Sequence, residues 1–97
     1  MDELPELDRK ALPDGTSAVV LLDPGTGWTR ERNLVRVDEH GDVMWLAELP
    51  AGTGADCFVD VTSIDAPAGE VTATTWSGYV VILSGETGRL LSSWFVK

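Results

Sequence analysis

The stretch YVVILSGETGRLLSSWFV, residues 79–96, decides the fold class of this chain. Five apolar residues stand in a row, a segment with two glycines follows, and then comes a second apolar run. Short apolar runs bounded by turn residues are typical of β-strands in a packed core. The stretch therefore predicts a hairpin of two strands, Tyr79–Leu83 and Arg89–Val96, joined by Ser84–Gly88.

An earlier stretch, NLVRVDEHGDVMWLAEL at residues 33–49, repeats this arrangement. Its centre, Asp-Glu-His-Gly-Asp, has the composition of a tight turn, and apolar runs flank it on both sides. Leu34 corresponds to Tyr79, 45 residues later, and Gly41 corresponds to Gly88. The sequence thus predicts a second hairpin and an internal repeat with that period.

The remaining strands are predicted in three segments, Ser17–Asp23, Cys57–Ile64 and Val71–Trp76. The first is an almost unbroken aliphatic run, which is typical of a strand buried on both faces. In the second, simple alternation places Asp60 and Thr62 on the same face as Phe58. Together with the two hairpins, these segments give about seven strands and predict an all-β antiparallel meander.

The repeat resembles the blades of β-propellers. VRVDEHGDVMW (residues 35–45) and VVILSGETGRLLSSW (residues 80–94) are similar in rhythm to quinoprotein-type and WD40-like repeats. A period of about 45 residues with three or four strands is the spacing of one blade. The resemblance covers about residues 17–96 and implies two blade-like units, about 17–49 and 57–96. It implies no particular activity, since such folds host many functions, and no cofactor-binding residue is carried over.

Two blade-like units are too few to close a ring, which takes about four blades or more. We therefore expect a single β domain over residues 16–97, whose two sheets pack together, cover their edges with loops or pair with another copy. Residues 1–15 are expected to form a short N-terminal arm, with one helical turn around Pro5–Leu12 as an alternative. Because Arg89–Val96 carries few charges, a homodimer or higher oligomer is a hypothesis.

The net charge of the chain limits the classes of partner that it can bind. Sixteen acidic residues face seven basic ones, for a net charge of −9, which disfavours nucleic acid and anionic membranes. It suits a protein partner with a basic surface, although solubility alone also explains it. The opening segment MDELPELDRK lacks the pattern of a signal peptide, and no apolar run reaches the ~20 residues of a membrane span. We therefore expect a cytoplasmic protein.

No motif predicts catalysis, a cofactor or a metal site. The glycine-rich segments PGTGWT and AGTGAD lack the lysine of a phosphate-binding loop and are interpreted as turns. The segment DEHGD contains the single histidine, His40, and lacks the ligand spacing of zinc and calcium sites. Cys57 stands alone in an apolar run and is expected to be a small buried side chain. We therefore expect a protein that is not an enzyme.

One basic and aromatic cluster stands out on this acidic chain. Three of the seven basic residues fall within residues 30–36, close to a tryptophan. Arginine and tryptophan are common at binding hot spots, although the arginines also balance neighbouring acids. The predicted protein-contact residues are Trp28, Arg30, Arg32, Arg36 and Trp76. Trp45 and Trp94 lie within predicted strands and are expected in the core.

These observations favour a small non-catalytic domain that binds protein. One alternative is an inhibitor or immunity protein that masks a basic enzyme surface, which fits the acidic charge and the small size. The other is a structural protein that assembles through its strand edges into a propeller-like oligomer.

Overall fold

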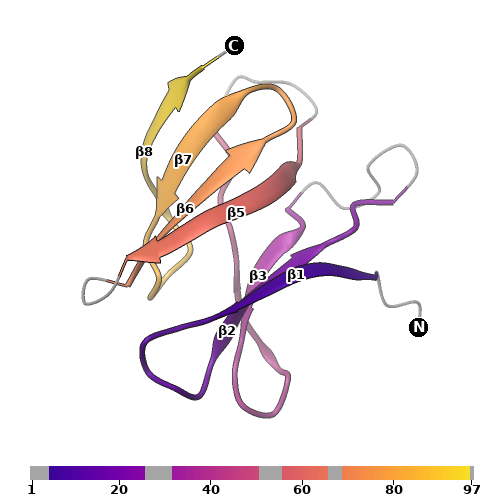
Figure 1. Ribbon diagram of the computed structural model, residues 1–97, viewed down its shortest axis with the longest axis vertical. Helices are drawn as coiled ribbons and strands as arrows, with labels where there is room; N and C mark the ends of the chain where they lie inside the picture. Colours follow the sequence, from indigo (N-terminus) through magenta and orange to yellow (C-terminus); the bar gives the residue numbers. More distant parts are fainter. Residues whose placement is uncertain (1–4, 26–31, 51–55, 66–68, 97) are drawn as a thin grey trace.

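The computed structural model describes residues 5–25, 32–50, 56–65 and 69–96, and all regular structure in these ranges is β-strand (Figure 1). Eight strands form two four-stranded antiparallel sheets. Sheet I contains β1 (Glu6–Ala11), β2 (Ala18–Leu22), β3 (Leu34–Val37) and β4 (Val43–Leu46). Sheet II contains β5 (Phe58–Asp65), β6 (Glu70–Thr75), β7 (Tyr79–Leu83) and β8 (Leu90–Phe95). The predicted fold class, an all-β meander in two sheets, is confirmed.

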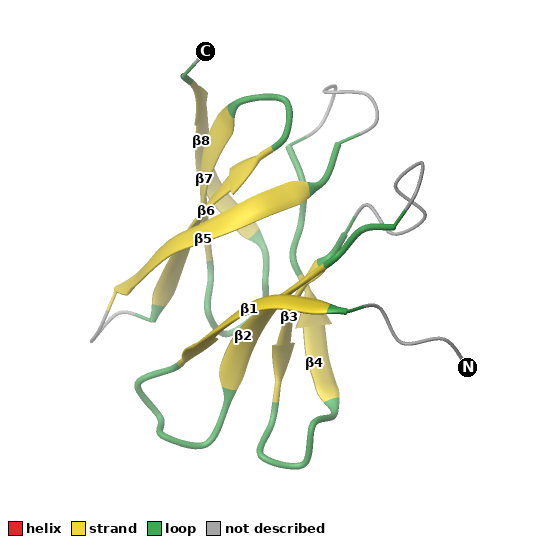
Figure 2. Ribbon diagram, turned by 45° about the vertical axis from the view of Figure 1, so that its right-hand side comes forward, coloured by secondary structure: helices red, strands yellow, loops and turns green. Residues whose placement is uncertain are grey.

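Both sheets have the same order, in which each strand pairs with the next one along the chain (Figure 2). The β3–β4 and β7–β8 turns use glycines at positive φ, Gly41 at 83° and Gly88 at 75°. In each turn this glycine donates its N–H to the carbonyl of the opening residue, Asp38 or Ser84. The two turns are therefore closed in the same way, although the turn in sheet II is one residue longer, and both predicted hairpins are present.

The turns correct the predicted alignment of the first strands of the two hairpins by one residue. Val37 directly precedes the turn in sheet I and Leu83 does so in sheet II, so the offset before the turn is 83 minus 37, or 46. Because the turn in sheet II is one residue longer, the offset after it is 88 minus 41, or 47. Leu34 therefore corresponds to Val80 and not to Tyr79. The difference matters because a shift of one residue moves every side chain of a strand to the opposite face.

The first strand was not foreseen. Residues 6–11 pair with β2 as strand β1, with Arg9 opposite Val20, so the prediction of an arm or a helical turn was wrong here. The pairing has a physical reason, because β2 is buried and both of its edges need hydrogen-bond partners. The charged side chains of β1 leave it largely exposed, which hid its strand pattern in the sequence. Sheet I consequently begins at Glu6 rather than near residue 17.

The main core lies between the two sheets. Val19 and Leu21 of β2 belong to the cluster that also contains side chains of sheet II. Ala18 and Val20 alternate with them and belong to a second cluster, on the face of sheet I turned away from sheet II. The predicted burial of β2 on both faces is thus confirmed, and Cys57 is buried as expected.

Two irregularities in β5 explain a wrong prediction about its faces. The pairing of β5 with β6 shifts between Phe58 and Asp60 and again between Val61 and Ser63. An extra residue at such a bulge reverses the alternation that follows it. Phe58 and Val61 are consequently both buried in the core, whereas Asp60 and Thr62 are exposed.

The tryptophans divide differently from the prediction. Trp45 is in the core, with 8% of its surface exposed, as expected. Trp94 was also expected there, but 46% of its surface is exposed. The reason is that β8 is the last strand of sheet II, and within the described residues no further strand or sheet covers it.

Candidate functional site

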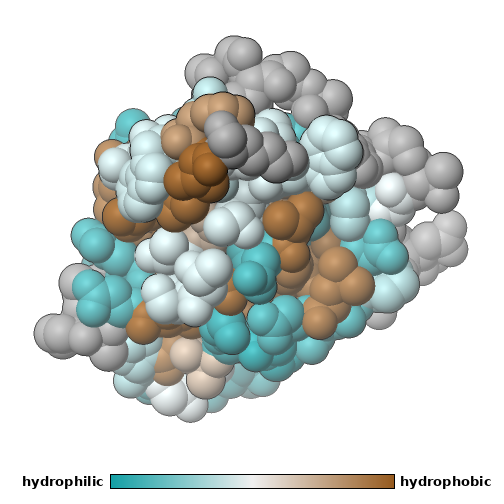
Figure 3. Space-filling model, turned by 45° about the horizontal axis from the view of Figure 1, so that its top comes forward, coloured by the Kyte–Doolittle hydropathy of each residue, from teal (hydrophilic) through white to brown (hydrophobic). Residues whose placement is uncertain are grey.

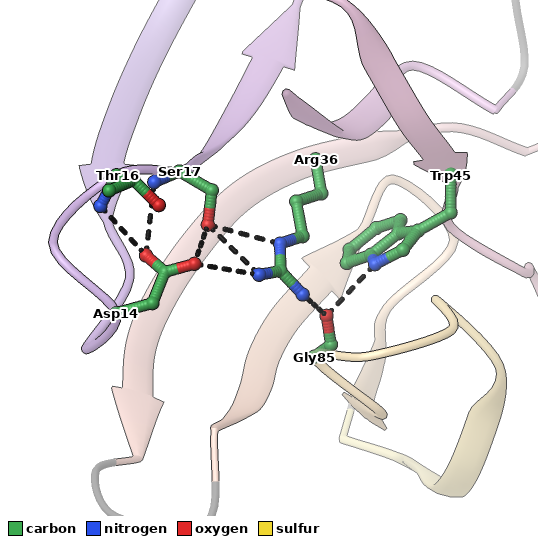
Figure 4. Close-up of polar contacts among 6 residues, drawn as sticks. All are labelled: Asp14, Thr16, Ser17, Arg36, Trp45 and Gly85. Carbon is green, nitrogen blue, oxygen red and sulfur yellow. Dashed lines mark hydrogen bonds and ion pairs between the residues drawn. The ribbon is translucent and has the colours of Figure 1, made fainter. Parts of the chain in front are cut away.

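Polar side chains of sheet I converge on one turn of sheet II (Figure 4). The Arg36 guanidinium, on β3, donates from Nη1 to the Gly85 carbonyl at 2.6 Å and from Nη2 to Asp14 Oδ2 at 2.9 Å. Its Nε donates to Ser17 Oγ at 3.1 Å. Only 15% of the Arg36 side chain is exposed. We call the group of Asp14, Ser17, Arg36, Trp45 and Gly85 the inter-sheet clamp.

Asp14 holds the arginine end of the clamp in place. Its carboxylate accepts hydrogen bonds from the Ser17 hydroxyl at 2.7 Å and from the backbone N–H groups of Thr16 and Ser17 at 3.0 Å. These bonds, with the bond from Arg36, hold the pKa of the Asp14 carboxyl well below its usual range. The carboxylate is therefore charged and oriented toward Arg36.

Trp45 forms the other arm of the clamp. Its Nε1 donates to the Gly85 carbonyl at 2.9 Å, so this carbonyl accepts from both Arg36 and Trp45. The indole also covers Gly88, where an added Cβ would lie 2.6 Å from Trp45 Cε3. A Cβ on Gly85 would collide with the backbone carbonyl of Gly69. Both glycines are required because neighbouring atoms approach them too closely for a side chain.

Asn33 makes a second polar link between the sheets. Its side chain is fully buried and donates from Nδ2 to the carbonyls of Leu22 in sheet I and Phe58 in sheet II, at 2.7 and 2.9 Å. Its Oδ1 accepts from the Phe58 N–H at 2.8 Å. The amide thus satisfies backbone groups where the two sheets meet, which leaves no free polar group at Asn33 for a ligand.

Asp56 is a buried carboxylate, and it too forms hydrogen bonds with groups of the chain itself. It accepts from the Cys57 N–H at 2.9 Å, the Ser77 N–H at 3.1 Å and the Ser77 hydroxyl at 2.6 Å. Within the described ranges, every buried side-chain nitrogen or oxygen has a hydrogen-bond partner. The interior polar groups therefore serve the fold, since buried polar groups are costly unless paired.

A small open pocket of about 170 Å³ lies beside the clamp. Its lining is Leu12, Pro13, Asp14, Arg36, Gly69, Gly85 and Glu86. The two charged groups of the clamp in this lining are already bonded to each other. The clamp therefore offers a small molecule little unused hydrogen-bonding capacity, and Glu86 is the further charged side chain in the lining.

The predicted contact residues are not equivalent in the structure. Arg36 belongs to the clamp, and Arg32 donates to the carbonyls of Leu46 and Ala47 at 2.6 and 3.0 Å. Trp76, in the β6–β7 turn, is exposed over 58% of its surface. Trp28 and Arg30 lie outside the described residues. Of the described members, only Trp76 presents a large apolar surface to solvent.

Exposed apolar side chains gather instead on the last strand of each sheet. Among the described residues, seven of the ten large apolar side chains that are exposed lie on β4, on β8 or next to β8. We call these seven residues the apolar rim: Val43, Met44, Leu46, Leu91, Trp94, Phe95 and Val96. The few charges of Arg89–Val96 indicated the β8 part of the rim in the sequence. The β4 part gave no such signal, because Val43–Leu46 looks like a core strand. Apolar patches also stand among hydrophilic side chains on the face shown in Figure 3.

Glu48 joins the two parts of the rim. Its N–H donates to the Gly88 carbonyl at 2.9 Å, and its Oε1 accepts from the Leu90 N–H at 2.7 Å. The end of β4 therefore lies against the start of β8. Leu46 and Leu91 are therefore the rim residues nearest this junction, whereas Val43 and Trp94 lie toward the far ends of their strands.

The described residues offer no assembled metal centre. No group of three histidine, cysteine or acidic side chains within them is placed to hold a metal ion. His40 lies in the β3–β4 turn with its side chain largely in solvent. Likewise, the part of the chain that the structure describes contains no helix long and apolar enough to span a membrane.

The fold and contacts define an all-β domain of two four-stranded sheets, joined by a polar clamp and bordered by an apolar rim. A family model described as "Domain of unknown function (DUF7957)" matches residues 5–95, and the chain belongs to that family. The matched range includes all eight strands, β1 among them. No curated protein and no solved structure matched the chain.

Proposed function

We propose that this domain is non-catalytic and works by binding another protein through the apolar rim. The observation that carries the proposal is the concentration of exposed apolar side chains on β4 and β8. Single exposed apolar residues are ordinary, but adjoining ones on a soluble domain mark interaction surfaces. Burial of such side chains is the main favourable term in protein association.

The aromatic residues of β8 are the expected anchors. Phe95 packs against Tyr79 with ring centroids 5.4 Å apart, and its remaining surface is exposed. Trp94 pairs with Val80 across the strands, so it lies on the opposite face of sheet II. Aromatic residues dominate binding hot spots because they bury a large area at a small entropic cost.

The non-catalytic part of the proposal is supported by the way the polar groups are used. Arg36, Asp14 and Asp56 all direct their charged groups to partners within the chain. A catalytic group needs instead to face a substrate, in a site that excludes water.

The net charge of −9 supports a second candidate, an inhibitor that masks a basic enzyme surface. Opposite charge accelerates encounter and favours such a partner over others. Salt distinguishes this candidate, because screening weakens binding between oppositely charged surfaces.

The test is a pull-down from the source cells with the immobilised chain. The comparison uses Trp94→Asp, and the matched control is Trp76→Asp, which changes a similarly exposed tryptophan outside the rim. The proposal predicts a retained protein that Trp94→Asp loses and Trp76→Asp keeps. Equal retention by both variants would contradict binding through the rim, and a measured turnover of any substrate would contradict the non-catalytic role.

A further inference from the structure

The two sheets pack on each other through faces of different kinds. Sheet I contributes the face that carries the Trp45 side chain. Sheet II contributes the face against which Trp45 packs, next to Gly88 in the β7–β8 turn. Because both sheets have the same strand order, each sheet has one face equivalent to the Trp45 face of sheet I and one face equivalent to the Gly88 face of sheet II. The packing of the two sheets uses one face of each sheet. The outer face of sheet I and the outer face of sheet II therefore remain unpaired within the described residues.

The outer face of sheet I corresponds to the face of sheet II that receives Trp45. It carries the second apolar cluster, of which Val35 and Val37 lie on β3. Their cross-strand partners Leu46 and Val43 extend the same face and are exposed. At its turn, Gly41 takes the place of Gly88, but no atom lies within 4 Å of a Cβ built there. The space that the Trp45 indole fills at Gly88 is thus open at Gly41.

The outer face of sheet II corresponds to the Trp45 face of sheet I. Val80 corresponds to Leu34, and Val80 pairs with Trp94 just as Leu34 is bonded to Ala47. Trp94 is therefore the equivalent of Ala47, which is fully buried in sheet I and lies two residues after Trp45. An exposed tryptophan thus occupies a position that is fully buried in the equivalent sheet.

From these two faces we infer that the partner of the apolar rim is a second copy of this chain, docked head to tail. The outer face of sheet II, with Trp94, packs on the outer face of sheet I of the next copy, near Val43 and Gly41. The inference rests on the proposed function and names its partner. An interface of this kind joins unlike surfaces, so repeated addition forms a ring where the rotation from copy to copy closes. Rings of about four to eight such sheets are known architectures, which corresponds to two to four copies.

The net charge of the chain determines how salt changes the strength of self-association. Each copy carries a net charge of −9, so copies repel one another at low ionic strength. Salt screens this repulsion and leaves the apolar contact intact. Self-association is therefore expected to strengthen with salt, the reverse of binding to a basic partner.

The test is sedimentation equilibrium of the full chain over a range of concentrations at low and high salt. The expected result is a species of two to four times the 10.4 kDa chain mass, favoured by salt. Trp94→Asp and Val43→Asp are each expected to return the mass to that of one chain. Trp76→Asp is the control and should assemble normally, and circular dichroism should show that all three variants fold.

Mixing separates head-to-tail docking from other arrangements. Trp94→Asp keeps an intact sheet I face, and Val43→Asp keeps an intact sheet II face, so an equal mixture should form a pair with one intact interface. A single-chain mass for the wild type under all conditions, or no pairing in the mixture, would overturn the inference. If the wild type stays monomeric while Trp94→Asp loses a cellular protein, the proposed function stands and only its partner is wrong.

Discussion

The indole Nε1 of Trp45 donates a 2.9 Å hydrogen bond to the carbonyl of Gly85, a residue forty positions later in the chain and in the other sheet. This bond, together with the bond from Arg36 to the same carbonyl, fixes the β7–β8 turn against sheet I. This turn leads directly into β8, so its position sets where β8 and its exposed side chains lie relative to β4. The clamp thus determines the shape of the surface to which we assign binding.

Substitution of Gly88 by alanine should destabilise the domain more than the same change at Gly41. Both residues have positive φ, so each substitution carries about 1–2 kcal/mol of backbone strain. At Gly88 the new Cβ would also press on the Trp45 ring, which adds about 1–3 kcal/mol of overpacking. Urea unfolding of the dilute chain measures the difference. Equal losses would show that the indole does not pack on Gly88.

Replacement of Arg36 by alanine should lower the free energy of unfolding by about 1.5–3 kcal/mol, the usual range for hydrogen bonds made by a charged group. The matched control is Arg9→Ala, which removes an exposed pair with Glu6 and should have little effect. Thermal unfolding of both variants by circular dichroism tests the comparison. If the two variants melt together, the clamp is not a stabilising contact.

The Asp14 carboxyl should make stability depend on pH in the acid range. Its pKa in the folded chain lies below the unfolded value of about 3.9, so the folded state favours the charged form. This contribution is present above the unfolded pKa and is lost as the pH falls toward the folded one. Asp14→Asn should therefore be less stable than the wild type at neutral pH, and the gap should narrow below about pH 4. Urea unfolding along a pH series tests this, and a constant gap would contradict it.

Much of the fold follows from patterns that the sequence shows directly. The apolar run at Tyr79–Leu83 is strand β7 with the same limits, and the glycine turns lie where the hairpins need them. Strand β1 could not be foreseen in this way, because an exposed edge strand has no apolar run. The bulges in β5 could not either, because backbone irregularities leave no mark on the alternation of residue types.

The clamp was predicted only in part. Arg36 stood out by its charge and Trp45 by its position in a strand, but their meeting point at Gly85 depends on how the sheets pack. The separations of 49 and 40 residues are set by tertiary structure alone. Asp14 had a local signal, since Asp-Gly-Thr-Ser is a sequence in which the carboxylate accepts from the following N–H groups.

The most direct test of binding through the rim is oxidative footprinting of tryptophan side chains. Reactivity is measured in the source cells and in the dilute purified chain. We predict that Trp94 is protected in the cells and reactive when dilute, whereas Trp76 reacts in both settings. Equal reactivity of Trp94 in the two settings would contradict the account.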